Sequence, residues 1–369
     1  SLQGSLVATG AAQTDRGIVL TSTLAAPGVA LGSPPSSAPG SLIGAATEMT
    51  LGSVGFPSAA MTLQSASGVS LSSSGLTFNS ASVQATGAIS ISGKSINVGS
   101  TPVTGGSVTF STPDPLSYSF IRAGGQIAST QGDIVFGDGL HLLSSIQNTV
   151  VRSARDILAT SMGSLQGGAR LEAGRNISLV AKDFNLNGIA PAISAGGSIY
   201  LRNSDSTGSI IGNTGLTSGG DVTLLSSRTI NLYDVTATGG KLTATGGKIS
   251  LGLVVADAGV LLRTNPVAGL TGDINLRGAA ISGVADFEVD ASGLLSVNTV
   301  TAGRDILVRA TGDVGFNTSG STAGRNISIS GATIFATNLE ARTGFLSAIA
   351  GNRVSVSGGA KAGSYVLAT

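Results

Sequence analysis

A short unit of alternating apolar residues recurs along this chain about every twenty residues. The clearest example is Thr301–Ile306, which returns almost letter for letter as Thr322–Ile327, and Glu172–Ile177 has the same form. Within each unit the apolar period is two, which is typical of a β-strand with one buried face. One such unit cannot bury its own apolar face, so successive units have to stack on one another.

The spacing predicts an all-β fold, a parallel β-helix (β-solenoid) with coils of about 20 residues and little or no helix. Ile89, Val108 and Ile127 follow one another at a constant interval, and Ile157 precedes Ile177 by nearly the same interval. We interpret each of these residues as the start of a strand that pairs with its equivalent one turn away, at about 4.8 Å. A second, weaker strand follows within most units.

An antiparallel sandwich is the alternative all-β fold. It would place two-residue Asn-Gly or Asp-Gly turns between its strands at a regular hairpin interval. Here such pairs are scattered, as at Asn187–Gly188, and no hairpin interval appears. The sequence therefore favours the β-helix.

The core of such a coil is expected to be a narrow column of Ile, Val and Leu. We expect wide side chains not to fit, in keeping with ten Phe, four Tyr and no Trp in 369 residues. Almost every strand follows one or two of the 55 glycines. These glycines are expected to supply the positive φ that turns the chain before each strand.

Composition excludes several classes of function. Without cysteine there is no disulfide, thiolate metal site or cysteine nucleophile, and one histidine cannot build a multi-histidine metal centre. A net charge of +1 leaves no basic stripe, so no nucleic-acid partner is expected. No apolar run approaches the roughly 20 residues of a membrane-spanning helix. The hydrophobic content of 41% argues against disorder.

The charges divide the chain into two parts. Only 5 of the 39 charged residues precede residue 122, and prolines cluster in that part. We therefore predict an irregular, charge-poor solenoid with Pro-rich loops over 1–121. A regular β-helical shaft is predicted over 122–369, in one continuous solenoid.

Two motifs resemble known sites, and we reject both. A Ser-His-acid triad has only His141 available, and the chain has no Gly-x-Ser-x-Gly elbow, so this histidine is interpreted as structural. The stretch Gly87–Ser95 nearly spells a phosphate-binding loop, but it has one residue too many between its glycines. Those intervening residues alternate as a strand does.

Clustered carboxylates are the remaining candidate, because polysaccharide-cleaving β-helix enzymes gather acidic and basic residues on one face of neighbouring coils. Asp286, Glu288 and Asp290 alternate along one strand, with Phe287 and Val289 between them. We interpret the acids as a solvated outer face and the two apolar residues as core. No catalytic, cofactor-binding or metal-ligating residue, no cofactor and no enzymatic activity are therefore expected, and a polysaccharide-active enzyme is the less favoured alternative.

The polar residues of the repeated unit are expected at equivalent corners of different coils. They are the pairs Arg175–Asn176, Arg304–Asp305 and Arg325–Asn326. We interpret them as a structural ladder that solvates the turn and hydrogen-bonds the backbone of the neighbouring coil. The Asn-apolar-Ser sequences at Asn176 and Asn326 match a glycan-acceptor pattern, which we attribute to coincidence within the repeat. The glycine-rich calcium-binding repeat is not present, so metal is not expected.

Three of the units, Ala173–Leu179, Ala195–Leu201 and Ala302–Val308, resemble the repeats of filamentous-haemagglutinin-type exoproteins. These are giant bacterial surface proteins exported by two-partner secretion. The resemblance, over roughly residues 80–360, implies a right-handed β-helical shaft, an extracellular or outer-surface location and an outer-membrane transporter as partner. The Asn-Pro-Asn-Gly-Ile stretch of that family's secretion domain is not found, and Asn265–Pro266 stands alone. A shaft segment or a mature fibre subunit is thus implied.

The expected function is that of an extracellular, non-catalytic shaft that mediates attachment or the formation of matrix and biofilm. Surface glycans or matrix would be its contacts. A self-assembling subunit of a fibre or sheath is the alternative, because uncapped strand edges at the ends of a solenoid favour end-to-end association.

Overall fold

Every regular element that the structure describes is a β-strand, and no helix occurs among these residues. The structure is a computed structural model. The residues that it describes are 7–8, 19–22, 29–31, 41–52, 61–65, 69–79, 81–85, 87–92, 95–99, 102–111, 120–123, 126–136, 150–160, 164–166, 170–187, 192–317 and 320–369.

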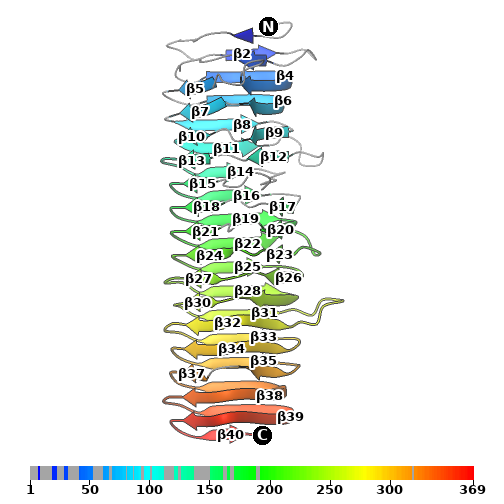
Figure 1. Cartoon of the computed structure of the whole chain (residues 1–369), viewed down its shortest axis with the longest axis vertical. Coiled ribbons are helices and arrows are strands. Elements are labelled where there is room, and N and C mark those ends of the chain that lie inside the picture. The colour runs from blue at the N-terminus through cyan, green and yellow to red at the C-terminus, as the bar shows by residue number, and fades with distance from the viewer. Residues whose placement is uncertain are drawn as a thin grey trace. The chain divides into compact units, whose positions relative to one another are not determined.

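The chain divides into two compact units, each of which is a stack of parallel coils (Figure 1). The first consists of Ser1–Ala181 and Asn187–Pro191, and the second of Lys182–Leu186 and Ala192–Thr369. The sequence-based boundary near residue 121 stays a prediction, since much of the part before it lies outside the described residues.

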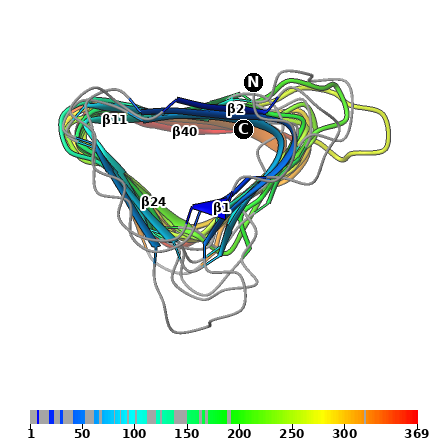
Figure 2. The same cartoon turned by 90° about the horizontal axis from the view of Figure 1, so that it is seen from above.

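Coils of the second unit have three sides, which are seen end on in Figure 2. The first side contains β22 (Ile199–Asn203), β25 (Val222–Leu225), β28 (Leu242–Gly246), β31 (Val260–Thr264), β33 (Phe287–Ala291), β35 (Ile306–Ala310) and β40 (Val366–Ala368). The second side contains β20 (Asp183–Asn185), β23 (Ile210–Ile211), β26 (Thr229–Asn231), β29 (Lys248–Leu251) and β36 (Val314–Phe316). The third side contains β21 (Ala192–Ala195), β24 (Gly215–Ser218), β27 (Val235–Ala237), β30 (Val254–Ala256) and β37 (Ser321–Ala323).

In the second unit four longer strands turn corners of the coil. The strands β32 (Ile274–Ser282) and β34 (Leu295–Ala302) continue from the second side onto the third, and β38 (Ile327–Ala341) and β39 (Leu346–Ala362) follow all three sides.

The first unit repeats this arrangement. Its first side contains β2 (Val19–Ser22), β4 (Ser41–Gly52), β6 (Val69–Asn79), β8 (Ala88–Ser92), β11 (Ser107–Ser111), β14 (Ile134–Phe136), β16 (Ile157–Thr160) and β19 (Ile177–Ala181), of which β4 and β6 continue onto the second side. The second side contains β1 (Val7–Ala8), β3 (Val29–Leu31), β9 (Ser95–Gly99), β12 (Phe120–Ala123) and β17 (Ser164–Gln166). The third side contains β5 (Met61–Ser65), β7 (Ala81–Ala85), β10 (Val103–Gly105), β13 (Gln126–Ser129), β15 (Val150–Ser153) and β18 (Arg170–Ala173).

Equivalent strands of successive coils pair in parallel, which confirms the predicted β-solenoid. Ile306 lies beside Ile327, and Ile327 lies beside Leu346, so both of these coils are close to the predicted length. In Figure 2 the amino-terminal side faces the viewer, and the chain passes clockwise from the side of β24 to that of β40. The coil is therefore right-handed.

One predicted equivalence is wrong. Val108 pairs with Ile134 and not with Ile127. Ile127 lies on the third side and pairs with Val103. This coil is longer than its neighbours, so a constant interval counted from Val108 ends on the wrong side of the coil.

Phenylalanine occupies the core, contrary to the expectation that wide side chains would not fit. Five phenylalanines are among the largest fully buried side chains, namely Phe110, Phe136, Phe184, Phe287 and Phe316. Phe110 and Phe136 are register partners on adjacent coils, and their rings stack with centroids 5.2 Å apart and an interplanar angle of 5°. These two rings lie flat on one another, whereas Phe287 lies between the smaller side chains Val260 and Ile306 of the adjacent coils.

Close approach between coils, rather than a positive φ, explains the glycine of the Ala-Gly-Arg corner. None of Gly174, Gly303 and Gly324 has a positive φ, which corrects the sequence-based expectation at these positions. A β-carbon on Gly324 would lie 2.0 Å from the carbonyl oxygen of Gly303 in the preceding coil. A side chain at this corner would therefore push neighbouring coils apart.

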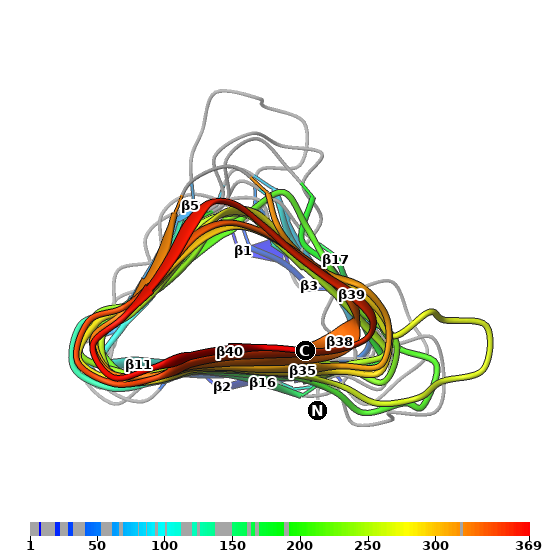
Figure 3. The same cartoon turned by 90° about the horizontal axis from the view of Figure 1, so that it is seen from below.

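The longest described coil of the second unit carries a loop that extends from one corner, drawn in yellow-green in Figure 3. It comprises residues 265–273, between β31 and β32. Val267 and Leu270 of this loop fold back beside Gly247. The loop lengthens the coil, so the register partners Val260 and Phe287 lie further apart in the sequence than the partners of the neighbouring coils do.

Candidate functional site

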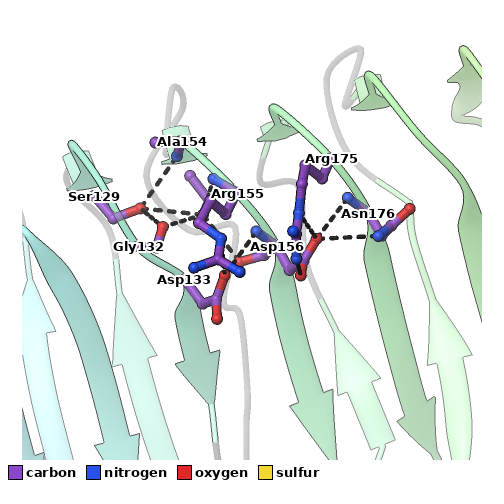
Figure 4. A network of polar contacts seen from close by, with 9 residues as sticks. Ser129, Gly132, Asp133, Ala154, Arg155, Asp156, Arg175 and Asn176 are labelled. Carbon is purple, nitrogen blue, oxygen red and sulfur yellow. Dashed lines mark hydrogen bonds and ion pairs between the residues drawn. The ribbon is translucent and has the colours of Figure 1, made fainter.

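A ladder of hydrogen bonds joins successive coils at the corner between the third and first sides. In the first unit the backbone N–H of Asp156 donates to Oδ1 of Asp133 at 3.1 Å, and that of Asn176 donates to Oδ1 of Asp156 at 2.9 Å (Figure 4). Each side chain at this position thus accepts the N–H of its equivalent in the next coil. We call this feature the corner ladder.

The second unit repeats the corner ladder over four successive coils. The N–H of Asp305 donates to Oδ1 of Asp286 at 3.1 Å, and the N–H of Asn326 donates to Oδ1 of Asp305 at 3.0 Å. Phe345 continues the series by donating to Oδ1 of Asn326 at 3.0 Å. The predicted bond to the backbone of a neighbouring coil is therefore confirmed.

Arginines add an outer layer to the corner ladder. Arg304 lies 3.4 Å from Oδ1 of Asp286, and Arg325 lies 2.6 Å from Oδ2 of Asp305. Arg175 pairs with Asp156 in the same way in the first unit. Each arginine thus pairs with the acid of the preceding coil, which uses the charge to hold adjacent coils together.

These contacts lower the pKa of the ladder carboxyls. The hydrogen bond from Arg175, helped by Asn176, holds the pKa of Asp156 below its ordinary value of 3.8, although burial opposes the shift. Burial raises the pKa of Asp305, but the hydrogen bonds from Arg325 and Asn326 together outweigh it, so this pKa is also lowered. Both carboxyls are therefore ionised at neutral pH, as an acceptor of two or more hydrogen bonds should be.

Buried serines complete the same corner from the inside. Oγ of Ser129 donates to the carbonyl oxygen of Gly132 at 2.8 Å and accepts the N–H of Ala154 at 3.2 Å (Figure 4). Oγ of Ser153 donates to the carbonyl oxygen of Asp156 at 2.9 Å. The corner therefore satisfies backbone groups that a plain turn would leave without partners.

The predicted acidic strand divides between two places. Asp286 precedes β33 and belongs to the corner ladder, which corrects its assignment to the strand face. Glu288 and Asp290 do lie on the outer face of β33, while Phe287 and Val289 are buried, as predicted.

Glu288 and Asp290 lie in a shallow groove that crosses four strands of the first side, from β31 to β38. We call it the β33 groove. Its lining residues are Leu261, Arg263, Glu288, Val289, Asp290, Leu307, Val308, Arg309, Ser328 and Ser330. The groove brings acidic, basic and apolar side chains together on the first side of the coil.

The sequence discloses the basic members of this groove only in part. Arg263 of β31 and Asp290 of β33 are register partners on adjacent coils. The loop of residues 265–273 lies between them in the sequence and lengthens the interval that separates them. Arg309 follows Asp290 at the usual interval and is in register with it. Its position could have been found from the repeat, but the position of Arg263 could not.

The other candidate motifs yield no site in the described residues. His141 lies outside them. The near match to a phosphate loop is strand β8 over Ala88–Ser92, paired on both sides, while Gly93 and Lys94 lie outside the described residues. Where the chain is described, no three His, Cys, Asp or Glu side chains are placed to hold a metal ion. No described helix is long and apolar enough to cross a membrane.

The register of its strands places this chain in the class of parallel β-solenoid repeat proteins. Comparisons with protein-family models, curated proteins and solved structures find no significant match to it. The likeness to filamentous-haemagglutinin-type repeats therefore rests on the repeated units alone.

Proposed function

We propose that this chain is a non-catalytic shaft segment of an extracellular bacterial exoprotein, which mediates attachment or the formation of matrix. The observation that carries the proposal is the continuous parallel register within each unit, reinforced at one corner by the corner ladder. Each coil forms backbone hydrogen bonds with the next. The acids and arginines of the corner ladder form ion pairs and hydrogen bonds that join adjacent coils. Such a structure suits mechanical support better than chemistry.

The partners and the location follow from the resemblance of the repeats. Similarity to filamentous-haemagglutinin-type units supports export through an outer-membrane transporter of the two-partner type and a place at the bacterial outer surface or in the medium. Surface glycans or matrix are the contacts that we propose for the shaft.

A self-assembling fibre subunit is the second candidate. Each coil pairs with the next through one repeated parallel register, as Ile327 does with Leu346, and the same register would join a coil of one chain to a coil of another.

Electron microscopy of the purified chain over a hundredfold range of concentration tests the proposal. We expect discrete particles whose length does not change, because a shaft segment has no need to associate with itself. Filaments that lengthen with concentration would support the fibre subunit instead. Release of reducing ends from neutral or acidic polysaccharides would contradict both and indicate the enzyme.

A further inference from the structure

The outer face of the β33 groove carries two parallel rows of side chains. In one row Glu288 lies between Leu261 and Leu307, and in the other Asp290 lies between Arg263 and Arg309. Adjacent members of a row are about 4.8 Å apart, and the rows are about 6.6 Å apart, from the geometry of paired strands. The groove is therefore a regular surface that runs across successive coils.

The four charged side chains of the groove have donors and acceptors that are not used within the described part of the protein. Within the described residues none of Arg263, Glu288, Asp290 and Arg309 forms an ion pair or a side-chain hydrogen bond. The arginines of the corner ladder, by contrast, are paired with acids of the preceding coil. Two carboxylates and two guanidinium groups, with their acceptors and donors, are thus open to a ligand.

The charge of the groove selects an uncharged ligand. Two arginines and two acids sum to zero, so neither a polyanion nor a polycation meets a complementary field. A polyanion would approach Arg263 and Arg309 only by also facing Glu288 and Asp290. A neutral partner with many hydroxyl groups can instead donate to the carboxylates and accept from the guanidinium groups.

The apolar side chains of the groove supply the other half of the recognition. Leu307 is 38% exposed, and Leu261 is half-buried beside Glu288. Ligand sites typically combine such apolar contacts with a few polar groups that fix orientation. Sugar rings match this combination, because they present hydroxyl groups at their edges and C–H groups on their faces.

We propose that the β33 groove binds an uncharged, hydroxyl-rich oligosaccharide, with its rings against the leucines and its hydroxyl groups on the two acids and two arginines. This inference deepens the proposed function and rests on it, because it assigns the attachment of the shaft to one place and one class of ligand. The binding is non-covalent and requires no catalytic group.

Calorimetric titration of the full chain tests this proposal. The probes are cellohexaose, laminarihexaose and mannohexaose, with hexagalacturonate as the acidic counterpart. We expect at least one neutral hexasaccharide to bind. The double variant Glu288→Gln/Asp290→Asn should bind it roughly tenfold more weakly or worse, because it loses two charged acceptors at nearly constant volume.

Arg202→Ala is the matched control, because Arg202 is exposed at the equivalent outward position of β22 and does not line the groove. It should bind as the natural chain does. The proposal is overturned if none of the three neutral sugars binds, if the double variant binds equally well, or if only hexagalacturonate binds. If electron microscopy shows discrete particles and any of these binding results is obtained, the proposed shaft function is retained and only the proposed ligand site in the β33 groove is rejected.

Discussion

Replacing Ile306 by Asp should unfold the second unit at a much lower urea concentration than the natural chain. Ile306 is fully buried, between Phe287 of the preceding coil and Ile327 of the following one. A carboxylate in this column would have no partner, and a buried unpaired charge costs on the order of 3–5 kcal/mol. Circular dichroism during a urea titration measures the loss.

The adjacent residue provides the control for this substitution. Leu307 points outward from the same strand and is 38% exposed, so Leu307→Asp places the same charge in solvent. We expect its unfolding free energy to fall by about 1 kcal/mol or less, because an exposed substitution costs little and the register partner Glu288 adds only a modest like-charge repulsion. Equal destabilisation by the two variants would show that the alternation of buried and exposed faces along β35 is wrong.

The second large effect is expected from Gly324→Ala, which adds a single methyl group at the corner. That β-carbon would lie 2.0 Å from the carbonyl oxygen of Gly303, a backbone atom that cannot turn aside. Two coils would have to separate, which strains the corner ladder beside them. We expect a loss of about 1–3 kcal/mol in unfolding free energy, as is typical of overpacking.

Gly351→Ala is the matched control for the corner glycine. Gly351 has no positive φ, and the nearest atom to a β-carbon built on it is the carbonyl oxygen of Ala332, at 3.9 Å. This variant should unfold with the natural chain in a thermal melt. If Gly324→Ala melted at the same temperature as well, the close stacking of coils at the corner would be refuted.

The fold was accessible from the sequence because two periods agree. Alternation within a strand identifies the buried face, and the interval between Ile306 and Ile327 identifies the coil. The side of the coil on which a strand lies cannot be predicted where the coil length changes. Ile127 is an example, because it lies on the third side and not on the first side with Val108. A loop changes the number of residues between register partners but not the stacking of the strands. Counting residues along the sequence therefore fails to identify the partners, although the coils stack as before.

The candidate site was accessible only in part. The outward direction of Glu288 and Asp290 follows from alternation around Phe287 and Val289. The position of Arg263 beside Asp290 does not follow from the sequence. It depends on the register of β31 and β33, which the loop of residues 265–273 separates in the chain. The structural role of the corner residues was predictable, since their repetition in successive coils already indicated a ladder.

The central claim is that each turn of the chain lies directly over its equivalent in the preceding turn. Disulfide formation tests it without competing thiols, because the chain contains no cysteine. Leu307 and Ser328 are register partners on adjacent coils, whereas Ser347 lies one coil further on. Neighbouring strands are about 4.8 Å apart, within the reach of a disulfide, and two coils are roughly 9.6 Å apart, beyond it.

The measurement is the fraction of chain cross-linked under mild oxidation in two double variants. We expect Leu307→Cys/Ser328→Cys to form its disulfide nearly completely, and Leu307→Cys/Ser347→Cys to remain reduced. Comparable cross-linking of both pairs, or cross-linking of the second pair alone, would contradict the stacked coil on which the proposed shaft and groove depend.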